Sequence, residues 1–357
     1  FLLVSSFSSS SSSSSSLQQT SMNNNDSYNS SSSSLEGKSL VSIEECLDAY
    51  KQTSNQGGSS SISWVDASWW HKGDLNGRDL FEQGPRIPGS VHLDMDDIAA
   101  RGDLFPELNP KNLPHMLPPK ELFAAAMDNF GIQKSNHIII YGRQSCFFTP
   151  RTLFLFRYMG HDPRKVHLMQ GSFEEWIAAG GEVETEPTTV AKAEELLASN
   201  LENNNKYDYQ VTSNAENVCD MNDMLRYMNI NNNEKENQPT VTEEHEDVII
   251  LDPRGSSFAS KGHMPGAIHI PYSKLVMPDN SLKFKPTEEL RSIFESAGVD
   301  VKSERQVICS CGSGVSVCSL FLALELCGRD SKNTFLYDGS WAEWGNDPNT
   351  PKIMPSK

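Results

Sequence analysis

Short apolar runs alternate with helix-length amphipathic segments along the chain, and this arrangement occurs twice. Each copy contains an apolar run that ends in Asp, a Pro-Gly turn, a further apolar run, a helix-length stretch and a Gly-Ser-aromatic turn. The markers are Asp66, Pro88-Gly89, residues 138–141 and Gly171 in the first copy, and Asp252, Pro265-Gly266, residues 307–310 and Gly339 in the second. Short buried strands that alternate with helices are typical of a mostly parallel sheet flanked by helices. The pattern therefore predicts the α/β class, with two tandem domains.

Local composition sets the expected limits of these domains. We expect a disordered Ser-rich tail or targeting remnant at residues 1–40, two folded domains at 41–184 and 246–350, and a short tail at 351–357. Residues 185–245 are rich in Glu, Asn and Thr, a composition that cannot bury enough apolar surface to offset chain entropy. We expect an acidic, Asn-rich linker there, in which "VCDMNDMLRYM" forms one short helix docked on a domain.

Overall charge and cysteine use narrow the possible partners and the compartment. The 357-residue chain carries a formal net charge of -17, which repels phosphate backbones and argues against a nucleic-acid partner. No apolar run reaches the roughly 18 to 20 residues that a membrane span needs. The 7 cysteines lack the spacing of a secreted disulfide scaffold, so we expect free thiols in a reducing compartment, mitochondrial or cytoplasmic. The chain begins with Phe1, and "FLLVSSF" could be the remnant of a targeting segment.

The segment "CSCGSGVS" places Cys311 between a predicted strand and a predicted helix. In such sheets ligands bind at the carboxyl ends of strands, where the loop enters the next helix. Gly312, Ser313 and Gly314 are small enough for successive backbone N–H groups to turn inward as an anion-binding cradle. This cradle favours a thiolate, the nucleophilic form of cysteine, so we predict Cys311 as the nucleophile. The predicted donor-binding residues of the loop are Gly312, Gly314, Val315 and Ser316.

The loop also has features of two other kinds of site, a zinc site and a phosphatase site. Cys309, Cys318 and Cys327 are expected to pack in the strand and the helix. Together with Cys311 they could supply four zinc ligands, but zinc sites use paired short spacings from converging segments. Cysteine-dependent phosphatases place an arginine six positions after the nucleophile, and here Val317 stands there, so a phosphate dianion lacks a guanidinium. We expect no metal and no organic cofactor.

Several motifs together resemble the two-domain rhodanese-type sulfurtransferases. They are "LPHMLP", "GHMPGAIHIP", "CGSGVS" and "YDGSWAEW", within residues 60–183 and 246–346. The resemblance implies two tandem rhodanese-like domains with the active site at their interface. It also implies that Cys311 takes a sulfur atom from a donor, becomes a persulfide, and passes the sulfur to a thiol or to cyanide. Gly142 stands at the position that corresponds to Cys311 in the first domain, which implies that this domain is non-catalytic.

The loop composition bears on the donor. "CGSGVS" is similar to the loop of family members that use 3-mercaptopyruvate, whereas members that use thiosulfate typically carry two cationic residues after the cysteine. The resemblance implies a Ser-His-Asp relay made of Ser313, His115 in "LPHMLP" and Asp96 in "LDMDDI". Such a relay can take the proton of the donor thiol. From residue types alone, Asp96 could instead cap a helix that begins near Asp97, and His115 could only fix a turn.

One departure from the family pattern concerns the carboxylate of the donor. Members usually place one arginine before the aromatic residue that follows "DxR", and another in the loop ahead of "GHIPG". Here Ser257 precedes Phe258 and that loop is missing. Arg254 remains and is assigned to substrate binding, although its matched position is normally structural and it could pair with Asp252. Lys261 could replace a lost cation only as a flexible point charge.

These observations leave three functions open. The first is a sulfurtransferase that moves a sulfane sulfur from 3-mercaptopyruvate, through a Cys311 persulfide, to cyanide or to a thiol acceptor such as thioredoxin. The second uses thiosulfate as the donor. The third is a persulfide carrier or scaffold with weak turnover, which the missing arginines favour and the retained Asp96, His115 and Ser313 oppose.

Overall fold

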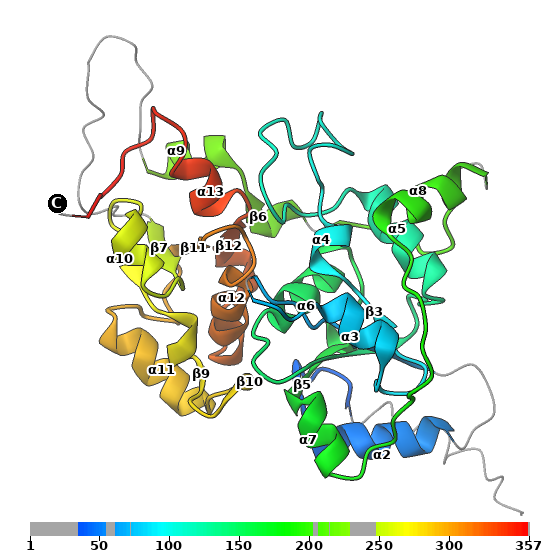
Figure 1. Ribbon diagram of the computed structural model, residues 1–357. Coiled ribbons are helices and arrows are strands. Elements are labelled where there is room, and N and C mark those ends of the chain that lie inside the picture. The colour runs from blue at the N-terminus through cyan, green and yellow to red at the C-terminus, as the bar shows by residue number, and fades with distance from the viewer. Residues whose placement is uncertain are drawn as a thin grey trace, which may run out of the picture.

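Two five-stranded sheets, each wholly parallel, form the centres of two domains (Figure 1). The computed structural model describes residues 35–54, 61–71, 73–202, 206–213, 215–228 and 248–355. The strands of the first sheet, in spatial order, are β1 (Leu40–Ser42), β5 (Val166–Ser172), β4 (His137–Gly142), β2 (Ile62–Asp66) and β3 (Val91–His92). Those of the second are β6 (Val218–Cys219), β12 (Thr334–Tyr337), β11 (Gln306–Cys309), β7 (Val248–Asp252) and β8 (Ile268–His269). The two orders match position for position, so the predicted repeat and the α/β class are confirmed.

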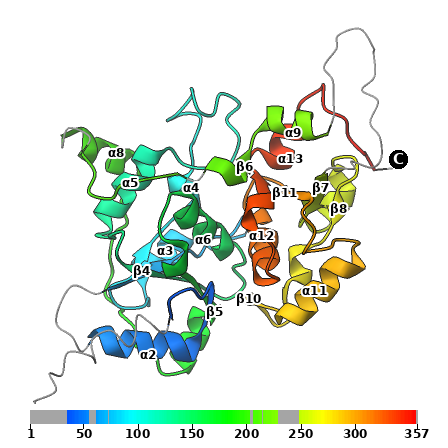
Figure 2. The same ribbon diagram turned by 180° about the vertical axis from the view of Figure 1, so that it is seen from behind.

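Helices cover both faces of each sheet, as the two opposite views show (Figures 1 and 2). In the first domain they are α2 (Ile43–Ser54), α3 (Gly77–Gln83), α4 (Met95–Ile98), α5 (Lys120–Asn129), α6 (Thr149–Tyr158), α7 (Phe173–Ala178) and α8 (Ala193–Glu202). In the second they are α9 (Met221–Tyr227), α10 (Ser257–Lys261), α11 (Thr287–Ser296), α12 (Val317–Leu326) and α13 (Ser340–Trp344). Short 3-10 turns lie at Pro163–Lys165, Ala215–Asn217, Tyr272–Lys274 and Ser331–Asn333. Alternate residues of each central strand therefore enter different cores; Ile138 and Ile140 pack toward α5 and α6, and Ile139 toward α2 and α7.

The predicted domain limits need three corrections. Leu35 is buried and β1 begins at Leu40, so the folded part starts before residue 41. Within 185–245, α8 packs on α5, while β6 joins the second sheet and α9 follows it, as the sequence predicted for that short helix. The C-terminal segment also packs, because Trp344 donates to the Pro351 carbonyl and His263 pairs with Ile353. The Ser-rich stretch 1–34 and the Asn-rich stretch 229–247 lie outside the described residues.

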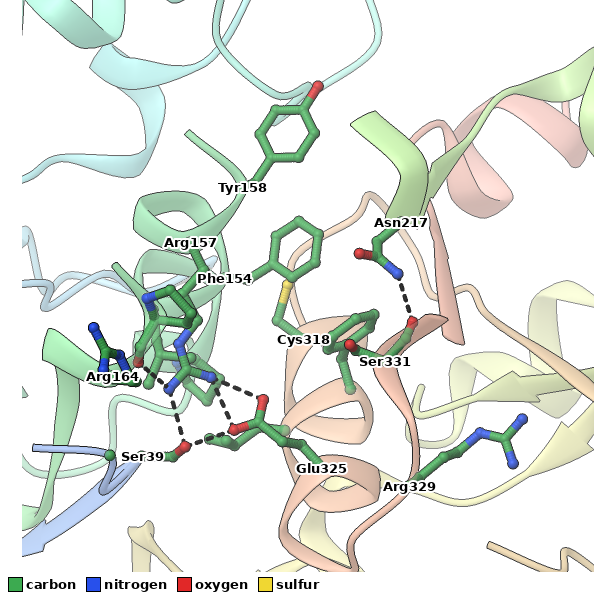
Figure 3. A pocket seen from close by; sticks show the side chains of 16 residues that line it. Ser39, Phe154, Arg157, Tyr158, Arg164, Asn217, Cys318, Glu325, Arg329 and Ser331 are labelled. Atoms are coloured by element: carbon green, nitrogen blue, oxygen red, sulfur yellow. Dashed lines mark hydrogen bonds and ion pairs between the residues drawn. The ribbon is translucent and has the colours of Figure 1, made fainter. Parts of the chain in front are cut away.

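The two domains meet along a pair of helices, α6 and α12, which run side by side in the same direction. Near their N-termini, Arg151 of α6 donates to the Gly314 carbonyl just ahead of α12. In the middle the rings of Phe154 and Phe321 meet edge to face with centroids 5.1 Å apart. Toward their C-termini, Arg157 pairs with Glu325 at 2.8 Å, and Figure 3 shows this pair beside a pocket along the two helices. A single buried apolar cluster runs through both domains, so the interface is part of the core.

A hairpin of the second domain also reaches the first. Its strands β9 (Val276–Met277) and β10 (Asn280–Phe284) are antiparallel. Ser281 Oγ donates to the Cys146 carbonyl at 2.9 Å, and Phe284 N–H donates to the Gln170 side chain at 2.8 Å. The loop that holds Cys311 therefore sits between two domains that are fixed to each other on more than one side. Among the described residues, no helix has the length and apolar character needed to cross a membrane.

Candidate active site

Cys311 lies in the loop that leaves the carboxyl end of β11, and its side chain is 1% exposed. The registers of the two sheets make it equivalent to the first-domain position predicted from the sequence. Cys309 pairs with Leu251 and Ser310 N–H donates to the Leu251 carbonyl, so Cys311 lies two residues beyond the end of β11. The equivalent position in the first domain is Gly142, where a Cβ atom would lie 2.7 Å from Thr149 Cγ2. The first domain therefore has no room for the matching cysteine.

Backbone N–H groups line the loop around Cys311. Ser340, at the start of α13, accepts the N–H groups of Cys311 (3.1 Å) and Gly314 (3.2 Å) on one hydroxyl, and this hydroxyl lies 4.0 Å from Cys311 Sγ. The four other N–H groups of the loop, at Gly312, Ser313, Val315 and Ser316, have no acceptor among the described residues. Unpaired N–H groups at a helix N-terminus attract anions, so the loop has the donors that a thiolate or a persulfide anion requires.

Gly314 gives this loop its shape. Its φ angle is 80°, in the left-handed region that residues with a Cβ rarely adopt. A Cβ atom here would lie 2.9 Å from both the carbonyl and a side-chain oxygen of Asp338. The first domain has Ser145, with φ 65°, at the matching place, so both domains turn their loops in the same way. The close approach to Asp338 is found only in the second domain and requires glycine.

The three residues of the predicted relay lie together across the domain interface. His115 Nδ1 is 2.8 Å from Ser313 Oγ, and His115 Nε2 is 3.4 Å from a carboxylate oxygen of Asp96. Since the carboxylate can only accept, the ring proton of neutral His115 belongs on Nε2, which leaves Nδ1 as the acceptor for the Ser313 hydroxyl. The hydrogen bond from His115 lowers the pKa of Asp96. The arrangement can accept a proton at Ser313 and His115 and stabilise the resulting imidazolium.

The geometry tests the two simpler roles for these residues, Asp96 as a helix cap and His115 as a turn residue. The N-cap of α4 is Asp94, whose side chain accepts the Asp96 N–H at 2.9 Å, so Asp96 is not the cap. Asp96 instead accepts the indole N–H of Trp69 at 3.0 Å, a contact that the sequence did not suggest. His115 does lie in a turn, with φ 58°, but its ring also reaches Ser313 in the other domain. A turn residue alone would not need that contact.

A pocket of about 450 Å³ opens onto Cys311. First-domain residues that line it include Trp69, Phe147 and Phe148, and second-domain residues include Cys311, Gly312 and Ser313. Ser257 lines the same pocket, at the position where the resemblance leads one to expect an arginine. The cations at its wall are Arg254 and Lys261. Val315 and Ser316 also line it, and the side chain of Val315 packs against Trp69 and Phe148.

Most contacts of Arg254 are structural, and it pairs with Asp252 as the sequence suggested. Its Nε and Nη2 atoms contact the carboxylate of Asp252, and Nη2 also donates to the Gly262 carbonyl at 3.0 Å. The guanidinium lies over the ring of Trp341, 4.9 Å from the centroid. Nη1 is buried and has no hydrogen-bond acceptor among the described residues. Arg254 therefore has one nitrogen left for a ligand at this wall of the pocket.

The remaining cysteines are buried free thiols. Burial raises the pKa of Cys309 in β11 and raises that of Cys318 on α12 to about 12. The first-domain Cys146 is held against the Trp69 carbonyl at 3.5 Å, and burial raises its pKa to about 11. These thiols pack as small apolar residues, as predicted for Cys309 and Cys318. No cluster of three or more potential metal ligands is found in the described part of the chain.

Two buried charged residues of this site went unnoticed in the sequence. Arg151 of the first domain is 2% exposed and pairs with Asp338 of the second at 3.0 Å. Asp338 also accepts the Leu117 N–H at 2.7 Å. Burial opposes the charge of Arg151, but the neighbouring carboxylate outweighs it and the pKa of Arg151 is raised. The sequence signal for Asp338 was the "YDGSW" motif, in which Asp338 and Ser340 are two residues apart. No local motif links Asp338 to Arg151.

Several known proteins resemble the chain in sequence. The family model described as "Rhodanese-like domain" matches residues 52–179 and 237–347. The chain is 30% identical to thiosulfate/3-mercaptopyruvate sulfurtransferase 2 of Arabidopsis thaliana over 84% of each chain. It is 30% identical to 3-mercaptopyruvate sulfurtransferase of Escherichia coli over 76% of this chain and 84% of that one. It is also 28% identical to mouse thiosulfate sulfurtransferase, over 80% of this chain and 85% of the relative.

Solved structures share the fold. A crystal structure of a 3-mercaptopyruvate sulfotransferase from Escherichia coli superposes with a TM-score of 0.64 at 24% identity, covering 85% of this chain and 99% of that one. The sulfur transferase subunit of yeast mitochondrial complex I gives a TM-score of 0.68 at 25% identity, covering 89% and 100%. The two tandem rhodanese-like domains expected from the sequence are confirmed.

Proposed function

The chain belongs to the rhodanese family, and we propose that it transfers a sulfane sulfur from 3-mercaptopyruvate through a persulfide on Cys311. The observation that carries this proposal is the 2.8 Å contact between His115 of the first domain and Ser313 of the cysteine loop, with Asp96 behind the histidine. A general base placed at the loop is needed for a donor that arrives as a thiol. The neutral loop also supports this donor, because it lacks the paired cations expected for thiosulfate.

The proposed first half-reaction balances without a cofactor. The Cys311 thiolate attacks the donor sulfur, an S–S bond forms, and the C–S bond breaks with its electron pair left on carbon. Ser313 and His115 accept the thiol proton and return it to that carbon, so that the enolate leaves as pyruvate. Cys311 then carries a persulfide anion, which the free N–H groups of Gly312, Ser313, Val315 and Ser316 stabilise.

The second half-reaction returns the enzyme to its starting form. A thiolate acceptor or cyanide attacks the outer sulfur, the S–S bond breaks, and its electron pair returns to Cys311 as the thiolate. With cyanide the product is thiocyanate. We propose a small thiol or a thioredoxin-like protein as the cellular acceptor and a mitochondrial or cytoplasmic location; one relative from Arabidopsis thaliana is named as mitochondrial.

The carboxylate of the donor has fewer partners here than in the family pattern. We assign it to the N–H group of Gly312 and the free Nη1 of Arg254, since Ser257 replaces the usual arginine at the pocket wall. Gly314, which the sequence predicted for donor binding, does not line the pocket, and its N–H group donates to Ser340. A single buried guanidinium nitrogen holds a carboxylate less firmly than a bidentate fork does. The Michaelis constant for 3-mercaptopyruvate is therefore expected to be high. Arg254→Gln removes the positive charge and should raise this Michaelis constant further, by about tenfold for the loss of one charged hydrogen bond.

Thiosulfate as the donor is the second candidate, because mouse thiosulfate sulfurtransferase is nearly as similar to the chain as the mercaptopyruvate enzymes are. The kcat/KM values of the purified full chain for the two donors, with cyanide as the acceptor, decide between them. We expect the value for 3-mercaptopyruvate to be the higher one. A higher value for thiosulfate would contradict the donor and its relay, while the Cys311 persulfide would stand.

A persulfide carrier or scaffold is the alternative from another class, and the missing arginine at Ser257 favours it. Steady-state turnover measured with and without a thioredoxin-like acceptor separates it from the enzyme. Turnover with small donors and cyanide alone supports the enzyme. Loading of Cys311 without turnover would favour the carrier.

A further inference from the structure

Arg151 holds the two halves of the proposed relay with one guanidinium. Its Nη1 donates to the Gly314 carbonyl at 2.9 Å, and its Nη2 donates to the His115 carbonyl at 2.9 Å and to Asp338 at 3.0 Å. Gly314 directly follows Ser313 in the loop. Arg151 therefore donates hydrogen bonds to the backbone of His115 and to that of Gly314, the residue after Ser313.

The His115 carbonyl belongs to a residue whose backbone conformation needs support, and the Gly314 carbonyl belongs to one whose conformation glycine adopts readily. His115 has φ 58° and Gly314 has φ 80°. For a residue with a side chain, such a conformation is unfavourable unless its surroundings hold it. The hydrogen bond from Arg151 to the His115 carbonyl supplies that support. Asp338 fixes the guanidinium in turn, and its second oxygen accepts the Leu117 N–H two residues beyond His115.

We propose that Arg151, paired with Asp338, is a positioning residue that sets His115 against Ser313 and so favours donors that bring a proton on their sulfur. This inference rests on the proposed relay and assigns it a residue that touches neither the donor nor Cys311. A buried guanidinium fork suits the task because its planar, always charged donors fix several acceptors in one geometry. A lysine would keep the charge and lose the simultaneous contacts.

The two donors differ in the proton that the relay has to move. A thiol has an ordinary pKa of about 8.5, so 3-mercaptopyruvate is mostly protonated on sulfur at pH 7. Thiosulfate is a dianion at this pH and brings no proton to remove. Misplacement of His115 therefore slows transfer from 3-mercaptopyruvate more than transfer from thiosulfate. A general loss of structure in the loop would slow both alike.

Arg157 provides a matched control on the same helix. It also crosses the interface, where it pairs with Glu325 and donates to Ser39 Oγ at 2.9 Å (Figure 3). It lies toward the other end of α6, away from the cysteine loop. Arg157→Lys removes a guanidinium from the interface without touching the carbonyls of His115 or Gly314.

The test measures kcat/KM for both donors in the full-length wild type, Arg151→Lys and Arg157→Lys, with the melting temperature of each. We expect Arg151→Lys to lower the value for 3-mercaptopyruvate at least about tenfold more than the value for thiosulfate, a range typical of weakened general base catalysis. Arg157→Lys should leave the ratio of the two values within about threefold of wild type. An equal fall for both donors in Arg151→Lys, or the same ratio change in Arg157→Lys, would overturn the inference.

Two further variants keep the outcome clear. If Arg151→Lys does not fold, Asp338→Asn decides by the same donor ratio, since it removes the charge that fixes Arg151 and keeps the side-chain shape; an unchanged ratio overturns the inference. His115→Ala separates this inference from the relay itself. If His115→Ala leaves the ratio unchanged, the relay is wrong. If His115→Ala changes the ratio and Arg151→Lys does not, only the role of Arg151 is wrong.

Discussion

At the scale of single residues, the site combines side chains whose roles follow from their immediate partners. His115 has a carboxylate on one ring nitrogen and a hydroxyl on the other. The hydrogen bond with His115 lowers the pKa of Asp96, so this carboxyl group stays ionised above its ordinary value near 4. Protonation of Asp96 should therefore not limit activity between pH 5 and 7.

Asp96→Asn tests the carboxylate directly. The amide can still accept the Trp69 N–H but cannot stabilise a charged imidazolium, so kcat/KM for 3-mercaptopyruvate should fall by about 10- to 100-fold. Steady-state kinetics with cyanide as the acceptor measure this. Asp94→Asn is not a suitable control because Asp94 caps α4, whereas Asp103→Asn changes an exposed carboxylate on the same domain. Equal activity of Asp96→Asn and Asp103→Asn would contradict the role of Asp96.

Cys311, Ser313, His115 and Asp96 could be predicted as site residues from the sequence because each lies in a recognisable motif. The sequence could not identify Arg151, whose partners Gly314 and Asp338 are brought to it only by the packing of two domains. It also could not decide how Arg254 is held, since that depends on the Gly262 carbonyl and the Trp341 ring. Motifs predict residue types, while such contacts depend on the whole fold.

At the scale of elements, the loop between β11 and α12 depends on one backbone conformation. Gly314→Ala should destabilise the protein by about 1–3 kcal/mol through its positive φ, and the new methyl group would also push against Asp338. We expect sulfur transfer from either donor to be largely lost. Chemical denaturation and donor kinetics measure the two effects separately.

Gly298→Ala is the matched control for that variant. Gly298 has φ 76°, and a Cβ atom there meets nothing within 4 Å. It should show the cost of the backbone strain alone and keep full activity per folded molecule. If Gly314→Ala retained the activity of Gly298→Ala, the close approach of the loop to Asp338 would not matter for the reaction.

Element limits also mark where composition misleads. Residues 185–245 look like a linker because they are rich in polar residues, yet α8 and β6 lie within them. Each is short and is stabilised by an element far away in the sequence, α5 for the helix and β12 for the strand. Local composition counts apolar residues within a segment. It therefore underestimates the structure of a segment whose few apolar residues pack on a core formed by other parts of the chain. The central strands were predicted well because both their faces are buried.

At the scale of the whole molecule, the first domain contains buried histidines that should make the stability of the protein fall at acidic pH. His167 Nδ1 lies 2.6 Å from the Lys38 carbonyl, which can only accept, so His167 Nε2 must accept from His137 at 2.9 Å. Burial lowers the pKa of His167 and of His161, each to about 4. Both are therefore neutral in the folded protein at pH 5 to 6, where an unfolded histidine is already mostly protonated.

The sign of the pH effect follows from these lowered values. The folded state favours neutral histidine, so this contribution to stability is complete above about pH 6.5 and is lost as the pH falls toward 4. The melting temperature should fall over that range, and His167→Gln should flatten the dependence. Thermal unfolding between pH 7.5 and 4.5 measures both. A melting temperature that is constant over this range in the wild type would contradict the assignment.

The central claim is that sulfur is transferred through Cys311, and mass spectrometry of the protein after brief incubation with 3-mercaptopyruvate tests it most directly. The account predicts that the peptide containing Cys311 gains the mass of one sulfur atom and that cyanide removes this atom as thiocyanate. Cys309→Ser, changed two residues earlier in the buried strand, should keep the added sulfur, and Cys311→Ser should not gain it. Cyanide-releasable sulfur in Cys311→Ser, or its recovery on another cysteine of the wild type, would contradict the account.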